Sequence, residues 1–135
     1  MVGAHERAHV KSFREVLGSR AAKKPRFDYR GATEDAERFR RTAVAFEDLA
    51  VEAYKGQAPQ IRRRAYLVTA LSIHAVEARH AAWIRRLAGI SPVLEAFDEP
   101  TTQKGALRVV RGTNFIVQDR RRPRTRSRRK PRYTG

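Results

Sequence analysis

Two Glu-x-x-His pairs, Glu6/His9 and Glu77/His80, occur in segments whose apolar residues recur at helical spacing, and Glu47 stands alone in a third such segment. Residues three apart lie on the same face of a helix, so each pair can present one carboxylate and one imidazole to a common point. Such pairs, joined by single carboxylates from neighbouring helices, form the ligand set with which four-helix bundles hold two metal ions in their core. The pattern therefore restricts the chain to helices that pack around a shared centre.

The spacing of apolar residues predicts three long helices, a weaker fourth one and an all-α fold. Glycines follow the first three, at positions where they are typical of helix ends. The weaker helix is expected to lead into a final apolar anchor at Phe115 and Ile116. The first helix is expected from about Val2 to Leu17, and the second from the N-cap Thr33 to Lys55, with Gly56 as its end. The third is expected to begin after Pro59 and to reach Leu87 or Ala88, and the weaker one to run from Thr102 to about Val110.

The candidate ligands lie in the middle of the apolar face of each long helix. Each apolar face is therefore expected to be buried and to carry ionisable groups at its centre. The predicted stripes are Val2, Glu6, His9, Val10, Phe13 and Leu17 in the first helix; Ala36, Ala43, Val44, Glu47, Ala50, Val51 and Tyr54 in the second; and Ala70, Ile73, Glu77, His80, Ala81 and Ile84 in the third.

An ionised carboxylate in a core costs several kcal/mol, and converging carboxylates also repel one another. A bound dication removes both penalties, because it supplies positive charge and a ligand partner. The alternative is that the Glu and His side chains satisfy one another by hydrogen bonds, with Arg40 at the edge of the stripe. Five such residues on three inward faces favour the metal. Since the chain has no cysteine, only nitrogen and oxygen ligands are available. The predicted metal ligands are Glu6, His9, Glu47, Glu77 and His80.

The formal net charge of +16 is concentrated near the C-terminus, where residues 119–135 hold nine Arg or Lys and one acidic residue. We expect residues 1–118 to form the helical domain and residues 119–135 to be a disordered basic tail. Arg-rich segments bind phosphate backbones through salt-sensitive electrostatics, so nucleic acid is an alternative partner. No apolar run approaches the ~20 residues that span a bilayer, and no signal peptide is visible.

Three other residues near the predicted faces are expected to have ordinary roles. His5 points away from the Glu6 stripe and is expected to be exposed to solvent. His74 faces partly inward and is expected to be a satisfied core histidine rather than a group that orients a ligand carboxylate. Tyr54, two turns from Glu47, is expected to pack at the end of the bundle.

The runs FEDLAVEAY (46–54) and VEARHAAW (76–83) resemble the bacterial ferritin-like domain family that includes desiccation-related proteins. The resemblance covers about residues 3–117, and the run HERAHVKSFREVLGS (5–19) is similar to the second bundle helix of that family. It implies a ferritin-like four-helix bundle with a dinuclear iron or manganese site. By this correspondence the family's second helix supplies Glu6 and His9, its third Glu47, and its fourth Glu77 and His80.

The first helix of the family carries another Glu, and nothing before Glu6 in this chain corresponds to that helix. The resemblance therefore implies an incomplete bundle of about three long helices and a short C-terminal one, with five of the six expected protein ligands. Either the natural protein is longer, which we favour, or a partner chain supplies the missing helix, for example in a homodimer.

Three functions are compatible with these features. The first is a ferritin-like metal-binding protein linked to oxidative or desiccation stress. The second is a metal-free structural or stress-protective bundle. The third is a nucleic-acid-associated protein that uses the basic tail. Enzymatic turnover and localisation stay open, although members of the resembled family are often exported.

Overall fold

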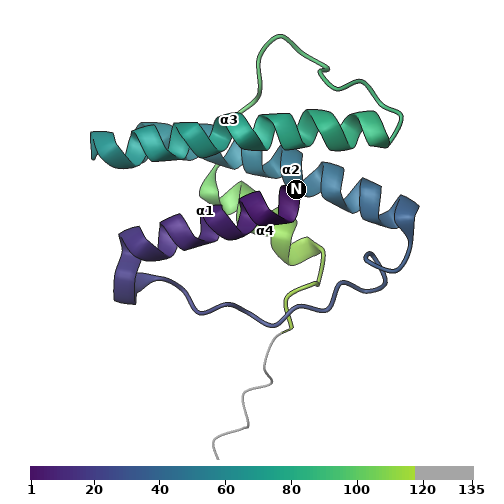
Figure 1. Cartoon of the computed structure of the whole chain (residues 1–135), viewed down its shortest axis with the longest axis horizontal. Helices are drawn as coiled ribbons and strands as arrows, with labels where there is room; N and C mark the ends of the chain where they lie inside the picture. Colours follow the sequence, from purple (N-terminus) through teal and green to yellow (C-terminus); the bar gives the residue numbers. More distant parts are fainter. Residues whose placement is uncertain (118–135) are drawn as a thin grey trace, which may run out of the picture.

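The computed structural model of the chain describes residues 1–117, so the predicted basic tail at 119–135 lies outside the described residues. Within residues 1–117 the fold is all-helical, as predicted, with one isolated β-bridge. None of the helices in this part has the length and hydropathy needed to cross a membrane. The elements are α1 (Val2–Leu17), the 3-10 helix η1 (Gly18–Arg20), α2 (Ala36–Gln57), the 3-10 helix η2 (Ala58–Gln60), α3 (Arg64–Leu87) and α4 (Gln103–Gly112), as Figure 1 shows.

The core lies between α2 and α3, which are joined by a short connection and pack side by side (Figure 1). In α2, Leu49 and Val51 are buried. A bidentate ion pair adds to this interface, with Arg85 Nε 2.8 Å from Asp48 Oδ1 and the Arg85 NH2 nitrogen 2.6 Å from Asp48 Oδ2. The six buried residues of α3 are Ala70, Ile73, Glu77, His80, Ala81 and Ile84, which confirms the stripe predicted for this helix.

The start of α2 differs from the prediction. Thr33 is not the N-cap; Asp35 is, and its side chain accepts a hydrogen bond of 2.7 Å from the Arg38 amide. This backbone hydrogen bond also lowers the pKa of Asp35. The helix starts later because Arg30 and Gly31 both have positive φ and form a turn that includes Thr33.

The sequence predicted that α2 ends at Gly56. In the structure Gly56 lies within the last turn of α2, which runs to Gln57. Its role is to let two backbone segments come close together, because a Cβ added here would overlap the carbonyl oxygen of Thr101. The Thr101 amide donates to the Glu52 carbonyl at 3.0 Å, and Lys55 donates to the Asp98 carbonyl. The missing side chain at Gly56 therefore lets the connection from α3 cross α2 just before α4 begins.

The connection between α1 and α2 is held by the last described residues. Phe27 and Ile116 form an antiparallel bridge, and the Asp28 amide donates to the Phe115 carbonyl at 2.8 Å. The Phe115 ring contacts Tyr29 edge-on at 5.7 Å between centroids and lies 6.1 Å from the Phe46 ring of α2. The prediction that Phe115 and Ile116 act as an apolar anchor agrees with these contacts.

In contrast to α3, α1 has no buried residue. Its one ring contact with α2 among the described residues is Phe13 with Tyr54, at 6.2 Å between centroids. The prediction of a buried α1 stripe is therefore wrong in this structure, because α2 and α3 reach only part of the helix and no other described long helix packs against it. Four apolar side chains of α1 are between 37% and 50% exposed: Val10, Phe13, Val16 and Leu17.

Candidate metal centre

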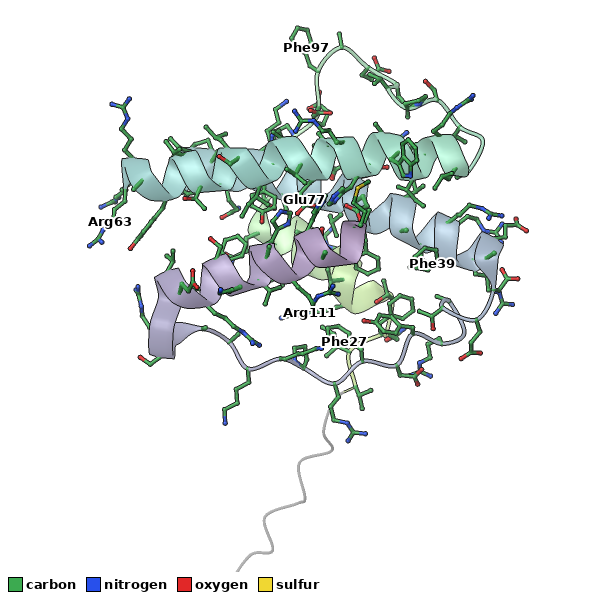
Figure 2. All side chains as sticks on the ribbon, in the orientation of Figure 1. Phe27, Phe39, Arg63, Glu77, Phe97 and Arg111 are labelled. Atoms are coloured by element: carbon green, nitrogen blue, oxygen red, sulfur yellow. The ribbon has the colours of Figure 1, made fainter. Side chains whose placement is uncertain are left out.

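Side chains from α1, α2 and α3 meet between the three helices, where Figure 2 shows Glu77 pointing from α3 toward α1. One ligand atom from each of Glu6, Glu47, Glu77 and His80 lies within 4.8 Å of the others. Glu77 and His80 are only 3% and 6% exposed, although both side chains can carry charge. The structure thus brings four of the five predicted ligands into one compact group, which we call the carboxylate cluster.

His80 lies at the centre of the carboxylate cluster. Its Nδ1 atom is 3.2 Å from Glu6 Oε1, 3.5 Å from Glu47 Oε2 and 3.4 Å from Glu77 Oε2. These carboxylates come from three different helices, so one ring nitrogen faces oxygen atoms from each of them. The Glu-x-x-His spacing in α3 makes this geometry, because it places His80 one turn from Glu77 on the buried face.

His9, the fifth predicted ligand, lies beside the carboxylate cluster rather than in its tightest part. Its Nδ1 atom is 3.0 Å from Glu77 Oε1 and 3.7 Å from Glu6 Oε1. Glu77 therefore directs one oxygen toward His9 and the other toward His80. A single buried carboxylate thus faces two imidazoles on two helices.

Three buried polar atoms at this point have no hydrogen-bond partner within residues 1–117: Glu6 Oε1, His9 Nδ1 and His80 Nδ1. Each of them lies between 3.0 and 3.7 Å from a carboxylate oxygen or an imidazole nitrogen of the other residues, yet none of these contacts is a hydrogen bond. Leaving a buried polar atom unpaired costs about 1–3 kcal/mol. Mutual Glu–His hydrogen bonding, the alternative from the sequence, does not account for these three atoms.

The electrostatics of the site oppose full ionisation. Burial, followed by the negative charges of Glu77 and Glu6, raises the pKa of Glu47 to about 8. Burial and the same two carboxylates also raise the pKa of the Tyr54 phenol above its usual range. A group of acids that holds a proton at neutral pH because no cation is nearby is suited to exchange that proton for a cation.

The residues present fit a metal ion. The donor set consists of carboxylate oxygens and imidazole nitrogens, which suits iron and manganese. The three unpartnered atoms are potential ligand atoms: Glu6 and His80 belong to the carboxylate cluster, and His9 Nδ1 lies beside it, 3.7 Å from Glu6 Oε1. In a metal site such atoms receive their missing partner from the ion.

Two histidines differ from expectation. His5 is not solvent-exposed but half-buried, with its Nδ1 atom 2.9 Å from His80 Nε2. Sequence reasoning missed it because the tilt of α1 relative to α3, which brings this residue beside His80, is not encoded in the spacing. His74 was expected to be a satisfied core residue, yet its buried Nε2 has no hydrogen-bond partner in the described part of the chain.

A separate hollow of about 420 Å³ lies between residues 92–99 and the helices α2 and α3. Asp48 and Arg85 on its wall form an ion pair, and four further acidic residues line the hollow: Glu52, Glu95, Asp98 and Glu99. None of the five predicted ligands lines it. The hollow therefore has no evident part in the chemistry of the carboxylate cluster.

Comparison with known proteins gives one result. The family model described as "Ferritin-like domain" matches residues 1–89, which contain all five predicted ligands. The resemblance drawn from the sequence extends to residue 117, and the match supports it as far as residue 89. No curated protein and no solved structure matches the chain significantly.

Proposed function

The chain belongs to the ferritin-like domain family, and on that premise we propose that it binds two divalent ions, iron or manganese, between α1, α2 and α3. The observation that carries the proposal is the convergence of four ligand atoms within 4.8 Å, together with buried atoms of Glu6 and His80 that have no hydrogen-bond partner within residues 1–117. The residues that would hold the ions are Glu6, His9, Glu47, Glu77 and His80.

Two ions, rather than one, are favoured by the position of Glu77. Its Oε1 atom is 3.0 Å from His9 Nδ1 and its Oε2 atom is 3.4 Å from His80 Nδ1. The two imidazoles therefore lie on opposite oxygens of one carboxylate, an arrangement that suits a carboxylate shared between two ions. Glu6 and Glu47 complete the group on the His80 side.

The chain's own residues supply charge and orientation. Glu47 would release its proton when a cation enters, because a nearby dication reverses the repulsion that raises its pKa. Glu77 and His80, both buried in the α2–α3 interface, hold fixed positions. Bound iron or manganese would provide redox and Lewis-acid chemistry at this point.

A role in oxidative or desiccation stress is the more specific part of the proposal. Its support is the similarity of residues 46–54 and 76–83 to desiccation-related members of the family. Nucleic-acid binding by residues 119–135 stays a prediction, since these residues lie outside the described part. Salt-dependent binding that is lost when they are removed would support it.

We further propose that another helix covers the exposed apolar side chains of α1, beyond its contact with Tyr54. The support is the exposure of Val10, Phe13, Val16 and Leu17, which leaves an apolar face uncovered on a helix that carries two of the ligands. A second copy of the chain is one source of this helix. Light scattering tests it: we expect a dimer for the wild type and a monomer for Val10→Asp, whereas a monomeric wild type contradicts the homodimer.

The decisive experiment is metal content by plasma mass spectrometry after loading with iron or manganese. We expect two ions per chain in the wild type and loss of both in the Glu47→Ala/Glu77→Ala double variant. The matched control is Glu15→Ala/Glu37→Ala, which removes two exposed carboxylates and should keep both ions. A wild type that takes up no metal would refute the proposal and leave the metal-free protective bundle.

A further inference from the structure

The ring of His80 is contacted at both nitrogens by two consecutive residues of α1. Glu6 Oε1 lies 3.2 Å from Nδ1, and His5 Nδ1 lies 2.9 Å from Nε2. Adjacent residues of a helix point about 100° apart, so a helix that passes the edge of the ring can reach both sides of it. No other residue is within hydrogen-bond distance of His80 Nε2 in the part of the chain that the structure describes.

The contact between the two histidines has the geometry of a hydrogen bond in the plane of both rings. The ring planes differ by 10° and the centroids are 5.2 Å apart. This separation equals the nitrogen–nitrogen distance of 2.9 Å plus one ring radius on each side, so the two centroids and the two nitrogens are nearly collinear. A ring lone pair and an N–H bond both lie along this line, so the contact is edge to edge rather than face to face.

A neutral imidazole has one N–H, and only one of the two facing nitrogens can carry it. In one arrangement His5 donates, which places the His80 proton on Nδ1, facing the carboxylates. In the other, His80 Nε2–H donates to His5, and Nδ1 presents a lone pair to Glu6, Glu47 and Glu77. The second arrangement is the one that a cation among these carboxylates requires, because a metal binds the lone pair of Nδ1, and oxygens of all three carboxylates lie within 3.5 Å of that atom.

We propose that His5 is a positioning residue, whose Nδ1 accepts a hydrogen bond from His80 Nε2 and so keeps the Nδ1 lone pair of His80 directed at the carboxylate cluster, ready for a divalent ion. This inference rests on the proposed function, because only a deprotonated ring nitrogen can bind a metal. Partners of this kind fix both the tautomer and the orientation of a ligating histidine, and their loss typically weakens metal binding 10–100-fold.

Three variants separate the contributions of His5. His5→Phe keeps a planar ring but removes the acceptor. His5→Asn keeps an oxygen acceptor near the position of Nδ1 but removes the ring. His74→Phe is the matched control, since it makes the same change at a histidine of α3 whose Nε2 has no partner. Far-UV circular dichroism confirms that each variant is helical before it is compared.

The first measurement is the position of the His80 proton, read by ¹⁵N NMR of the metal-free protein at mildly alkaline pH. We expect the proton on Nε2 in the wild type and in His5→Asn, and a mixture of tautomers in His5→Phe. A wild type with the proton on Nδ1 would overturn the proposal. This measurement needs no metal, so it tests His5 even if the chain proves to bind none.

The second measurement is Mn²⁺ affinity by competition with a chelator of known affinity. We expect His5→Phe to bind 10–100-fold more weakly than the wild type, and His5→Asn and His74→Phe to stay within a few-fold of it. Equal affinity in the wild type and His5→Phe would overturn the positioning role. Failure of the wild type to bind Mn²⁺ or iron would instead refute the proposed function. The NMR measurement would then still decide whether His80 Nε2 donates a hydrogen bond to His5 Nδ1.

Discussion

The raised pKa of Glu47 makes a prediction about the stability of the metal-free protein. An acid whose pKa is raised on folding stabilises the fold while it is protonated. Its contribution is complete below its ordinary pKa of 4.5 and is lost as the pH rises through about 8. The free energy of unfolding of the chelator-treated protein should therefore fall between about pH 5 and pH 9. In Glu47→Gln, where the side chain stays neutral, this fall should be absent.

The size of this loss of unfolding free energy follows from how far folding raises the pKa of Glu47. A pKa moved from 4.5 to about 8 would correspond to about 5 kcal/mol, since each unit is worth about 1.4 kcal/mol. The Glu47 side chain is 17% exposed and that of Glu6 is 44% exposed, so solvent screens the charges and we expect a loss of about 2 kcal/mol. Other groups that titrate in this range are common to both proteins, and the difference between the two stability curves removes their contribution.

The assay is urea unfolding of wild type and Glu47→Gln at several pH values in the presence of a chelator, followed by circular dichroism. The control is Glu37→Gln, on the exposed first turn of α2, where an ion pair of 3.1 Å with Arg41 is expected to contribute less than about 0.5 kcal/mol. Added Mn²⁺ should stabilise the wild type and the control but not Glu47→Gln. Parallel curves for wild type and Glu47→Gln would refute the argument that burial among carboxylates keeps this side chain protonated.

Three further predictions concern the fold and are checked by urea unfolding. Gly56→Ala places a methyl group against the backbone that crosses α2 and should destabilise the protein by about 1–3 kcal/mol. The control Gly112→Ala, at a position with open space around it, should be neutral or stabilising. Equal effects of the two substitutions on the free energy of unfolding would contradict the argument that Gly56 lets the two backbones come close. Arg85→Met leaves Asp48 largely buried without its partner and should cost about 1–2 kcal/mol, which a second substitution, Asp48→Asn, should partly restore. Phe115→Ala should lower the free energy of unfolding by about 2 kcal/mol and speed amide hydrogen exchange in the connection between α1 and α2. Unchanged exchange would show that this ring does not anchor the connection.

The helices and the ligands of α3 could be predicted from the sequence because both depend on local periodicity. The stripe around Glu77 and His80 is buried as expected, since α3 packs along its length against α2. Glu47 and Glu6 reach the same point for the same reason, as the central ionisable groups of their helical faces.

Features that depend on how distant segments meet were not predictable in this way. Gly56 was expected to end a helix, but its function is set by Thr101, which is remote in sequence. The position of His5 depends on how α1 crosses α3. Thr33 was a suitable N-cap by type, yet the turn at Gly31 moved the start of α2 to Asp35. Spacing fixes which residues share a face, and packing decides what that face meets.

The weak attachment of α1 has a consequence for the order of assembly. The α2–α3 pair is close in sequence and buries its own apolar core, so we expect it to form early in folding, when loop closure is least costly. Within residues 1–117, α1 contacts this pair through the Phe13–Tyr54 ring pair and through three ionisable side chains, those of His5, Glu6 and His9. Such a helix gains little by docking until the charges are balanced. Glu47, Glu77 and His80 would therefore be in place on the preformed pair before α1 brings Glu6 and His9. The site would be complete only after α1 has docked, so that no permanent channel into the protein is required.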